Sequence, residues 1–469
     1  MTIASSSRAG RVSRRRFGSG HAAATIISSL LLVVAAAAPA GAQMGMGMGF
    51  GQAVGGISVD AHGIVRTLDP EASQELAARR REVLAQGAGV GGKPAALRKV
   101  SLARLCKAID EFSSTGKPLP ADVVFLGGLE RITHVFVDPD GHDVILAGPA
   151  DAAVIDPAGN VVAAASGRPL LQLEDLMTAL RAIDGVRAGG VRCSIDPSPE
   201  GVTKLQRYLG SLKSIGANPE ATLRTMETVL GPQKVTVGGV PAESRIARVL
   251  VAADYRMKRI GMGLEPSGVA GLPSYLSMVP AGGTSGATLP RFWLEAEYDP
   301  ITRDPDELAW QLSGRRMKCL TESDIFAAGG PARGKAPADK VAQAWCAAMT
   351  EHYDDLARRQ PVFGELLNCV DLTVVAALIH GRQLDRRAGL ELSALVDATR
   401  LTLPAYEAPA TLSTVATGFK KGTNWIVSAS GGVQFQPWAF ATNTTESGDS
   451  AAARVAALDG RPADAWFWD

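Results

Sequence analysis

Hydrophobic positions along the chain follow two periods, one typical of strands and one of helices. Three segments share a hairpin pattern, in which β-branched residues flank an aspartate that a glycine follows three residues later: 57–65, 135–141 and 154–162. The aspartate side chain bonds the turn backbone and the glycine takes a positive φ. With a further strand at 143–146, residues 121–165 are predicted to form an antiparallel meander.

Helical periodicity covers much of the remaining chain. Apolar residues recur every three or four positions and predict helices at 69–87, 101–112, 173–183, 202–212, 218–230, 246–260, 340–359 and 362–380. The last two meet at Gln360-Pro361, which predicts a helical hairpin. Cys346 and Cys369 would then lie about 10 Å apart along its axes, at roughly 1.5 Å per residue, which disfavours a disulfide between them.

Two further hairpins are predicted towards the C-terminus. One joins 308–312 to 317–320, and the other joins 424–428 to 433–437 around Ser430-Gly431-Gly432. The predicted fold class is therefore α+β, with antiparallel hairpins and a meander covered by helices, then a helical hairpin and a C-terminal β-hairpin.

Glycine- and proline-rich stretches suggest the domain organisation. The predicted segments are a signal peptide at 1–42, a Gly/Met-rich linker at 43–56, an α+β domain with the meander at 57–215, a second α+β segment at 216–327, a linker at 328–338, the helical hairpin plus C-terminal strands at 339–440, and a tail at 441–469. The tail ends in Trp466-Phe467-Trp468. These aromatics are interpreted as a strap packed on the protein itself, with an anchor for a partner as the alternative.

The first 42 residues have the three parts of an export signal. Five arginines precede an apolar stretch at 26–38, and Ala40-Gly41-Ala42 fits a signal peptidase site. We expect cleavage between Ala42 and Gln43, and export to the periplasm, the cell surface or the medium. Arg14-Arg15 resembles the twin-arginine motif, so the twin-arginine and general secretory routes both stay open. No transmembrane anchor is expected after signal removal.

The net charge bears on the expected partner, and the cysteine content bears on the expected disulfide bonding. The chain has 48 basic and 47 acidic side chains, and loss of the five signal arginines leaves 43 against 47, a net charge of −4. A nucleic-acid partner is therefore not expected, because phosphate binding needs a basic surface. The five cysteines are an odd number and do not suggest a disulfide scaffold. The expected partner is an unidentified envelope or surface component.

No established catalytic or metal motif stands out. The chain lacks Gly-x-Ser-x-Gly and His-Glu-x-x-His, although His134 and His142 could face each other across a hairpin. Asp138 to Asp143 resembles the carboxylate spacing of a calcium loop, but these residues are also ordinary turn formers. Met44, Met46 and Met48 could offer soft sulfur ligands to Cu(I), but a glycine linker also tolerates methionines, and no His or Cys joins them. We therefore expect no metal and no cofactor, and assign no catalytic residue.

The densest mixture of basic and aromatic side chains lies near position 256. Arg256 and Arg259 could bind a carboxylate or a phosphate, and on a helix Tyr255 would share a face with Arg259. Alternatively, Asp254 and Lys258 form an ordinary surface pair and the arginines cover a helix edge. Arg256 and Arg259 are thus the candidate ligand-binding residues, as an anion site.

Several segments together resemble a family of secreted proteins from planctomycete-type bacteria that is catalogued only as a domain of unknown function. The resemblance spans about 57–440 and rests on FLGGLERITHVFVDPDGHDVILAGPAD, GNVVAAASGRPLLQLEDLMTALRAI, CSIDPSPEGVTKLQ, VLVAADYRMKRIGMGLEP and PVFGELLNCVDLTVVAALI. It implies lineage and export, and carries no activity, cofactor or catalytic residue.

Two functions remain in view at this point. The first is a non-enzymatic exported binding or structural module, and the alternative is an extracytoplasmic hydrolase with a carboxylate and arginine site between 121 and 325. A deep pocket lined by convergent polar groups near Arg256 and the Gly/Pro/Ser-rich loop at 262–290 would favour the hydrolase. A smooth, convex surface with a single exposed apolar patch would favour the binding module.

Overall fold

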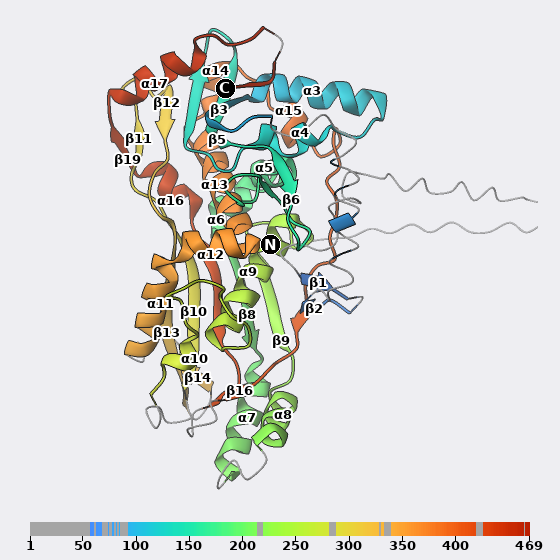
Figure 1. Cartoon of the computed structure of the whole chain (residues 1–469), viewed down its shortest axis with the longest axis vertical. Helices are drawn as coiled ribbons and strands as arrows, with labels where there is room; N and C mark the ends of the chain where they lie inside the picture. Colours follow the sequence, from blue (N-terminus) through green and yellow to red (C-terminus); the bar gives the residue numbers. More distant parts are fainter. Residues whose placement is uncertain are drawn as a thin grey trace, which may run out of the picture. The chain divides into compact units, whose positions relative to one another are not determined.

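The protein is described from a computed structural model (Figure 1). The residues described are 57–60, 62–67, 74, 77–78, 81, 84, 92–212, 219–280, 288–327, 330–332, 339–418, 425–463 and 465–469. The predicted signal peptide and its cleavage site at Ala42 and Gln43 lie outside them, as do the Gly/Met-rich linker and most of the predicted helix at 69–87.

The described part of the chain is α+β, as predicted. Its helical segments are α3 (Leu102–Thr115), α4 (Ala121–Val124), the 3₁₀ turn η1 (Leu126–Gly128), α5 (Leu173–Arg181), α6 (Ile183–Gly189), α7 (Pro199–Ser211), α8 (Pro219–Leu230), α9 (Arg245–Gly261), α10 (Tyr275–Met278), α11 (Lys340–Glu351), α12 (Tyr353–Arg359), α13 (Pro361–Gly381), α14 (Leu384–Ala388), α15 (Ser393–Val396), α16 (Pro437–Thr442) and α17 (Asp449–Leu458).

Two large sheets, both mixed, organise these helices. The first has the order β1 (Ile57–Val59), β2 (Ile64–Thr67), β15 (Thr411–Leu412), β9 (Gln233–Gly238), β8 (Val191–Pro197), β18 (Ser430–Phe435), β10 (Thr288–Glu297), β13 (Arg316–Ala327), β14 (Gly330–Ala332). The second has the order β19 (Thr444–Glu446), β11 (Ile301–Arg303), β12 (Ala309–Gln311), β4 (His134–Asp138), β5 (Asp143–Ala150), β3 (Ala95–Ser101), β20 (Phe467–Trp468). Strands from all three predicted segments between 57 and 440 share the first sheet, so the predicted boundaries do not divide it.

The predicted meander is only partly present. β4 and β5 form a hairpin, whereas β6 (Ala153–Ile155) and β7 (Val161–Ala163) form a separate two-stranded sheet, and α4 and η1 occupy 121–124 and 126–128. Asp60 caps its turn, and Gly63 and Gly159 take positive φ as expected. In the β4–β5 turn His142, with φ +50°, takes that role in place of the predicted glycine.

Both C-terminal hairpin predictions are wrong. β12 pairs with β4 in the second sheet and β13 pairs with β10 in the first, so the segment between them passes from one sheet to the other. β17 (Trp425–Ile426) pairs with β16 (Thr417–Gly418), and β18 pairs with β10 and β8. The alternating patterns did predict strands, but short-range patterns do not specify the partners. β12 and β18 pair with strands distant in sequence, and β17 pairs with the short strand that precedes it.

The predicted helical hairpin between 340–359 and 362–380 is present only between α12 and α13. The segment 340–359 breaks at His352 into α11 and α12, of which α12 packs on α13 while α11 packs on β13. α13 is the one helix in the described part that is long and apolar enough to cross a membrane. Within its most apolar stretch of 18 residues, 94% is buried inside the protein. It therefore serves as a core helix, packed against α5, α9 and α16.

Candidate functional site

The two candidate arginines lie on α9, one of the most buried helices. Ser244 begins the helix, because its hydroxyl accepts a hydrogen bond from the Ala247 amide at 3.2 Å. The helix packs on β8 (Figure 1) and on β18 of the first sheet. Arg256 and Arg259 follow in the last two turns, with about a quarter of each side chain exposed (23% for each).

The neighbouring Asp254 and Lys258 are not the surface pair that was considered from sequence. Asp254 is fully buried and Lys258 is 4% exposed. The Lys258 ammonium donates to the Asp254 carboxylate at 2.9 Å and to the Ile195 and Gly431 carbonyls of β8 and β18 at 2.8 and 3.3 Å. Burial raises the pKa of Asp254 to about 7, against the attraction of Lys258. This pair therefore ties α9 to the centre of the first sheet.

Arg256 and Arg259 converge on a single carboxylate, that of Glu265. The Arg256 Nε lies 2.7 Å from Glu265 Oε1 without the alignment of a hydrogen bond, and the Arg259 Nε donates to Glu265 Oε2 at 3.1 Å. The predicted face shared with Tyr255 is confirmed, since the Arg259 guanidinium lies 5.4 Å from the Tyr255 ring centroid. Two guanidinium groups and one carboxylate leave a local charge of +1.

A cavity opens in the loop that follows α9. It has a volume of about 520 Å³ and is lined by residues 263–269 and 272–274, which include Glu265. The lining residues include the apolar Leu264 and Leu272 and the polar Ser267 and Ser274. The size lies within the usual range for small-molecule sites. The cavity lies inside the loop 262–290, and its lining residue Glu265 contacts the two arginines, which are not themselves lining residues.

Hydrogen bonds from other elements hold this loop in place. The Gln360 amide, between α12 and α13, donates to the Pro266 and Ser267 carbonyls at 3.1 and 3.0 Å. The Trp345 indole of α11 donates to the Pro273 carbonyl at 2.9 Å, and the Ser267 hydroxyl closes the loop on the Leu272 carbonyl at 2.7 Å. The cavity is therefore largely preformed, which lowers the entropic cost of binding.

A second arginine and carboxylate cluster lies deep in the core. Arg245 at the start of α9 contacts three carboxylates: Asp175, Glu365 at 2.8 Å and Glu174 at 3.5 Å. The Tyr406 hydroxyl donates to Glu174 at 2.9 Å. Burial raises the pKa of Glu174 to about 7, although Arg245 opposes the shift. These groups bind one another and join α5, α9 and α13, so they hold the helices together.

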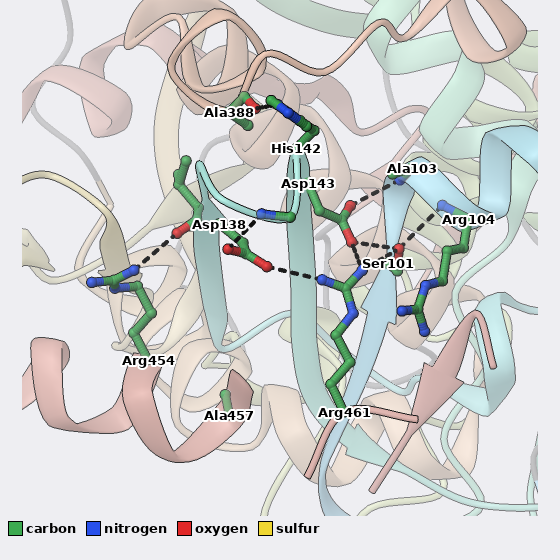
Figure 2. A network of polar contacts seen from close by, with 12 residues as sticks. Ser101, Ala103, Arg104, Asp138, His142, Asp143, Ala388, Arg454, Ala457 and Arg461 are labelled. Carbon is green, nitrogen blue, oxygen red and sulfur yellow. Dashed lines mark hydrogen bonds and ion pairs between the residues drawn. The ribbon is translucent and has the colours of Figure 1, made fainter. Parts of the chain in front are cut away.

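The segment considered as a calcium loop holds a guanidinium in the place of a metal ion. Figure 2 shows Arg461 between Asp138 and Asp143, which are cross-strand partners on β4 and β5. It donates to Asp138 at 2.9 Å and to Asp143, which also accepts from the Ser101 hydroxyl and from the Ala103 amide at 2.9 Å. Asp143 is the first residue of β5, and its fully buried side chain lies against the first turn of α3.

The candidate histidines do not meet across this hairpin. His134 pairs with Ala147 at the far end of β4, whereas His142 lies in the turn with its Nδ1 3.2 Å from the Ala388 carbonyl (Figure 2). In the described part of the chain, no group of three or more His, Cys, Asp or Glu side chains could hold a metal ion. Met44 to Met48 lie outside the described residues.

The aromatic tail packs on the protein itself, as its first interpretation predicted. Phe467 and Trp468 form β20, the edge strand beside β3, and the Trp468 indole donates to the Ala457 carbonyl at 3.2 Å. Arg98, 1% exposed, donates to the Asp469 side chain at 2.6 and 2.9 Å. Together with Arg461 these contacts fix the C-terminal segment to the second sheet.

Replacing Arg461 by glutamine is expected to lower the free energy of unfolding by about 2 to 4 kcal/mol, because the buried Asp143 loses its cationic partner. Urea unfolding measures this loss, and proteolysis after residue 458 should accelerate. Arg400→Gln is the control: Arg400 pairs with Asp110 at 3.0 Å but both side chains are nearly half exposed, so its loss should stay below about 1 kcal/mol. Equal losses of stability in Arg461→Gln and Arg400→Gln would contradict the role of Arg461 as the partner of the buried Asp143.

Comparison with known proteins identifies a family for one segment of the chain. Residues 193–275 match a family described as Protein of unknown function (DUF1598). The resemblance to a family of unknown function is therefore confirmed over this segment, which contains two of the five quoted stretches. No curated protein and no solved structure matches the chain. The matched segment runs from β8 to the first residue of α10, so it contains α9, both candidate arginines and the cavity loop.

Proposed function

We propose that the protein is exported and acts as a non-enzymatic binding module, whose cavity in the 263–274 loop takes a small ligand with an apolar body and one carboxylate or phosphate group. The observation that carries this proposal is the pair Arg256 and Arg259, which share the single carboxylate Glu265 in the cavity wall. The basic and apolar residues before Ala42 support export.

The local charge favours an anion over a cation. Each arginine has further N–H groups beyond the Nε that faces Glu265, so a ligand oxyanion can bind the pair without displacing this carboxylate. The apolar lining residues then contact the rest of the ligand. The other large arginine and carboxylate cluster, at Arg245, is almost fully buried and its charges face one another, which favours binding over hydrolysis as the function.

Benzoate and its neutral analogue benzamide test the proposal by calorimetry on the purified protein. Benzoate is expected to bind and benzamide is not. Arg256→Gln and Arg259→Gln should each weaken benzoate binding by about 10- to 100-fold, the usual range for one charge-assisted hydrogen bond. A separate measurement tests export. N-terminal sequencing of the protein recovered from outside the cytoplasm should give Gln43 as the first residue.

Two matched variants complete the experiment. Glu265→Gln removes the competing charge and should strengthen benzoate binding, opposite to the arginine variants. Arg224→Gln changes an arginine that is 72% exposed on α8, and should leave binding unchanged. Equal binding of benzoate and benzamide would contradict the anion site, and release of a product from benzoate esters would favour the hydrolase alternative.

A further inference from the structure

Two buried cysteines from different elements lie in contact. The Sγ atoms of Cys319 on β13 and Cys346 on α11 are 3.3 Å apart, and the two residues are 5% and 3% exposed. α11 packs along β13 (Figure 1), so both side chains point into the same interface. None of the other three cysteines has a sulfur contact with a cysteine among the described residues, and the Cys369 thiol lies instead 3.8 Å from the Asp175 carboxylate.

One hydroxyl group fixes the backbones of both cysteines. The Thr350 Oγ1 accepts a hydrogen bond from the Cys319 amide at 2.8 Å and donates to the Cys346 carbonyl at 2.8 Å. The spacing of the two residues is thus set by the secondary structure as well as by side-chain packing. A disulfide bond is about 2.05 Å long, so small rotations of two side chains would bring these sulfur atoms to bonding distance.

We propose that Cys319 and Cys346 form a disulfide bond when the chain folds under oxidising conditions, and that Cys106, Cys193 and Cys369 remain thiols. In this step two thiols lose two protons and two electrons, and the oxidant, a protein or small-molecule disulfide, is reduced to two thiols by exchange. The bond would link α11 covalently to β13. Its presence in the cell rests on the proposed export, because oxidising compartments preserve such bonds.

Oxidation must precede the burial of the pair. Burial raises the pKa of the Cys319 thiol well above its usual value, and the thiolate is the reactive form. In the folded protein this thiol is therefore inert, and an exchange catalyst or oxidised glutathione has to act on the folding chain.

Refolding the full chain in a buffer of oxidised and reduced glutathione tests the bond independently of export. After denaturation and alkylation without reduction, we expect three alkylated cysteines, and five after reduction. Digestion should yield one linked peptide pair, containing Cys319 and Cys346. Five alkylated cysteines without reduction, or a link between any other pair, would overturn the proposal.

Single variants make the assignment specific. Cys346→Ser should give four alkylated cysteines without reduction, whereas the control Cys106→Ser should give two and keep the link. The melting midpoint of the oxidised protein should exceed that of Cys319→Ala by roughly 2 to 8 °C, and dithiothreitol should remove most of this difference. An oxidised product on refolding, but free thiols in protein isolated from cells, would contradict export and leave the pairing established.

Discussion

Replacing Gly431 by alanine is expected to prevent stable folding, with a loss of more than about 4 kcal/mol in the free energy of unfolding. Gly431 has φ +109°, and an added Cβ atom would lie 1.9 Å from the Phe292 carbonyl oxygen. This oxygen belongs to β10, which pairs with β18 in the parallel register Phe292 to Gly431. The strands would have to separate, which breaks hydrogen bonds in the middle of the first sheet.

Urea unfolding and the yield of soluble protein measure the effect of Gly431→Ala. Gly210→Ala provides the matched control, because Gly210 lies in α7 and a Cβ atom there meets nothing within 4 Å. Alanine favours helix, so the control should be unchanged or more stable by up to about 1 kcal/mol. A soluble Gly431→Ala protein with the same stability as the control would contradict the close approach of β18 and β10.

Gly431 also shows why the sequence predicted the strands better than it predicted which strands pair. Ser430-Gly431-Gly432 was interpreted as a turn, since glycine permits positive φ, and Gly431 does adopt it. The residue serves a different purpose, because an added Cβ on Gly432 would also lie 1.8 Å from the Cys193 carbonyl oxygen of β8. Close packing between strands distant in sequence leaves the same signal as a turn.

Two local hydrogen-bonded motifs, in contrast, lie where the sequence places them. The Ser101 cap of α3 and the aspartate turn at Asp60 depend on hydrogen bonds to residues within four positions. They are complete within a few residues, so the sequence contains all the information that they need.

The shared partner of Arg256 and Arg259 was not predicted. Glu265 lies nine and six residues beyond them, across the end of α9, and helical spacing does not predict that contact. Asp254 and Lys258 carried a signal that was overlooked, because Leu250, Asp254 and Lys258 follow the apolar face at intervals of four. Arg461 gave none, since its partners Asp138 and Asp143 are more than 300 residues away.

The second large effect is expected at Arg245, which contacts the buried Asp175 and the largely buried Glu174 and Glu365. Arg245→Met should lower the free energy of unfolding by about 3 to 5 kcal/mol at neutral pH, the usual cost of removing one partner from a buried ion pair. The methionine keeps apolar volume, so the loss reports mainly the uncompensated charge on Asp175, Glu174 and Glu365. Arg224→Met, at an exposed pair with Glu220, should change stability by less than about 0.5 kcal/mol.

The dependence on pH separates this charge effect from a loss of packing. Burial raises the pKa of Glu174 from 4.5 to about 7, so the folded protein binds more protons than the unfolded chain between these values. The contribution of Glu174 to stability therefore falls as the pH rises through this window. Arg245 opposes the shifts of Glu174 and Asp175, so its removal raises both pKa values further. The loss in Arg245→Met should be larger at pH 8 than at pH 5.

Urea unfolding of both proteins at pH 5 and pH 8 measures this difference. Adding Asp175→Asn to Arg245→Met removes one of the uncompensated charges, so the double variant should recover part of the stability at pH 8 and little at pH 5. A loss that is equal at the two pH values, with no recovery in the double variant, would show that Arg245 stabilises the protein through packing alone.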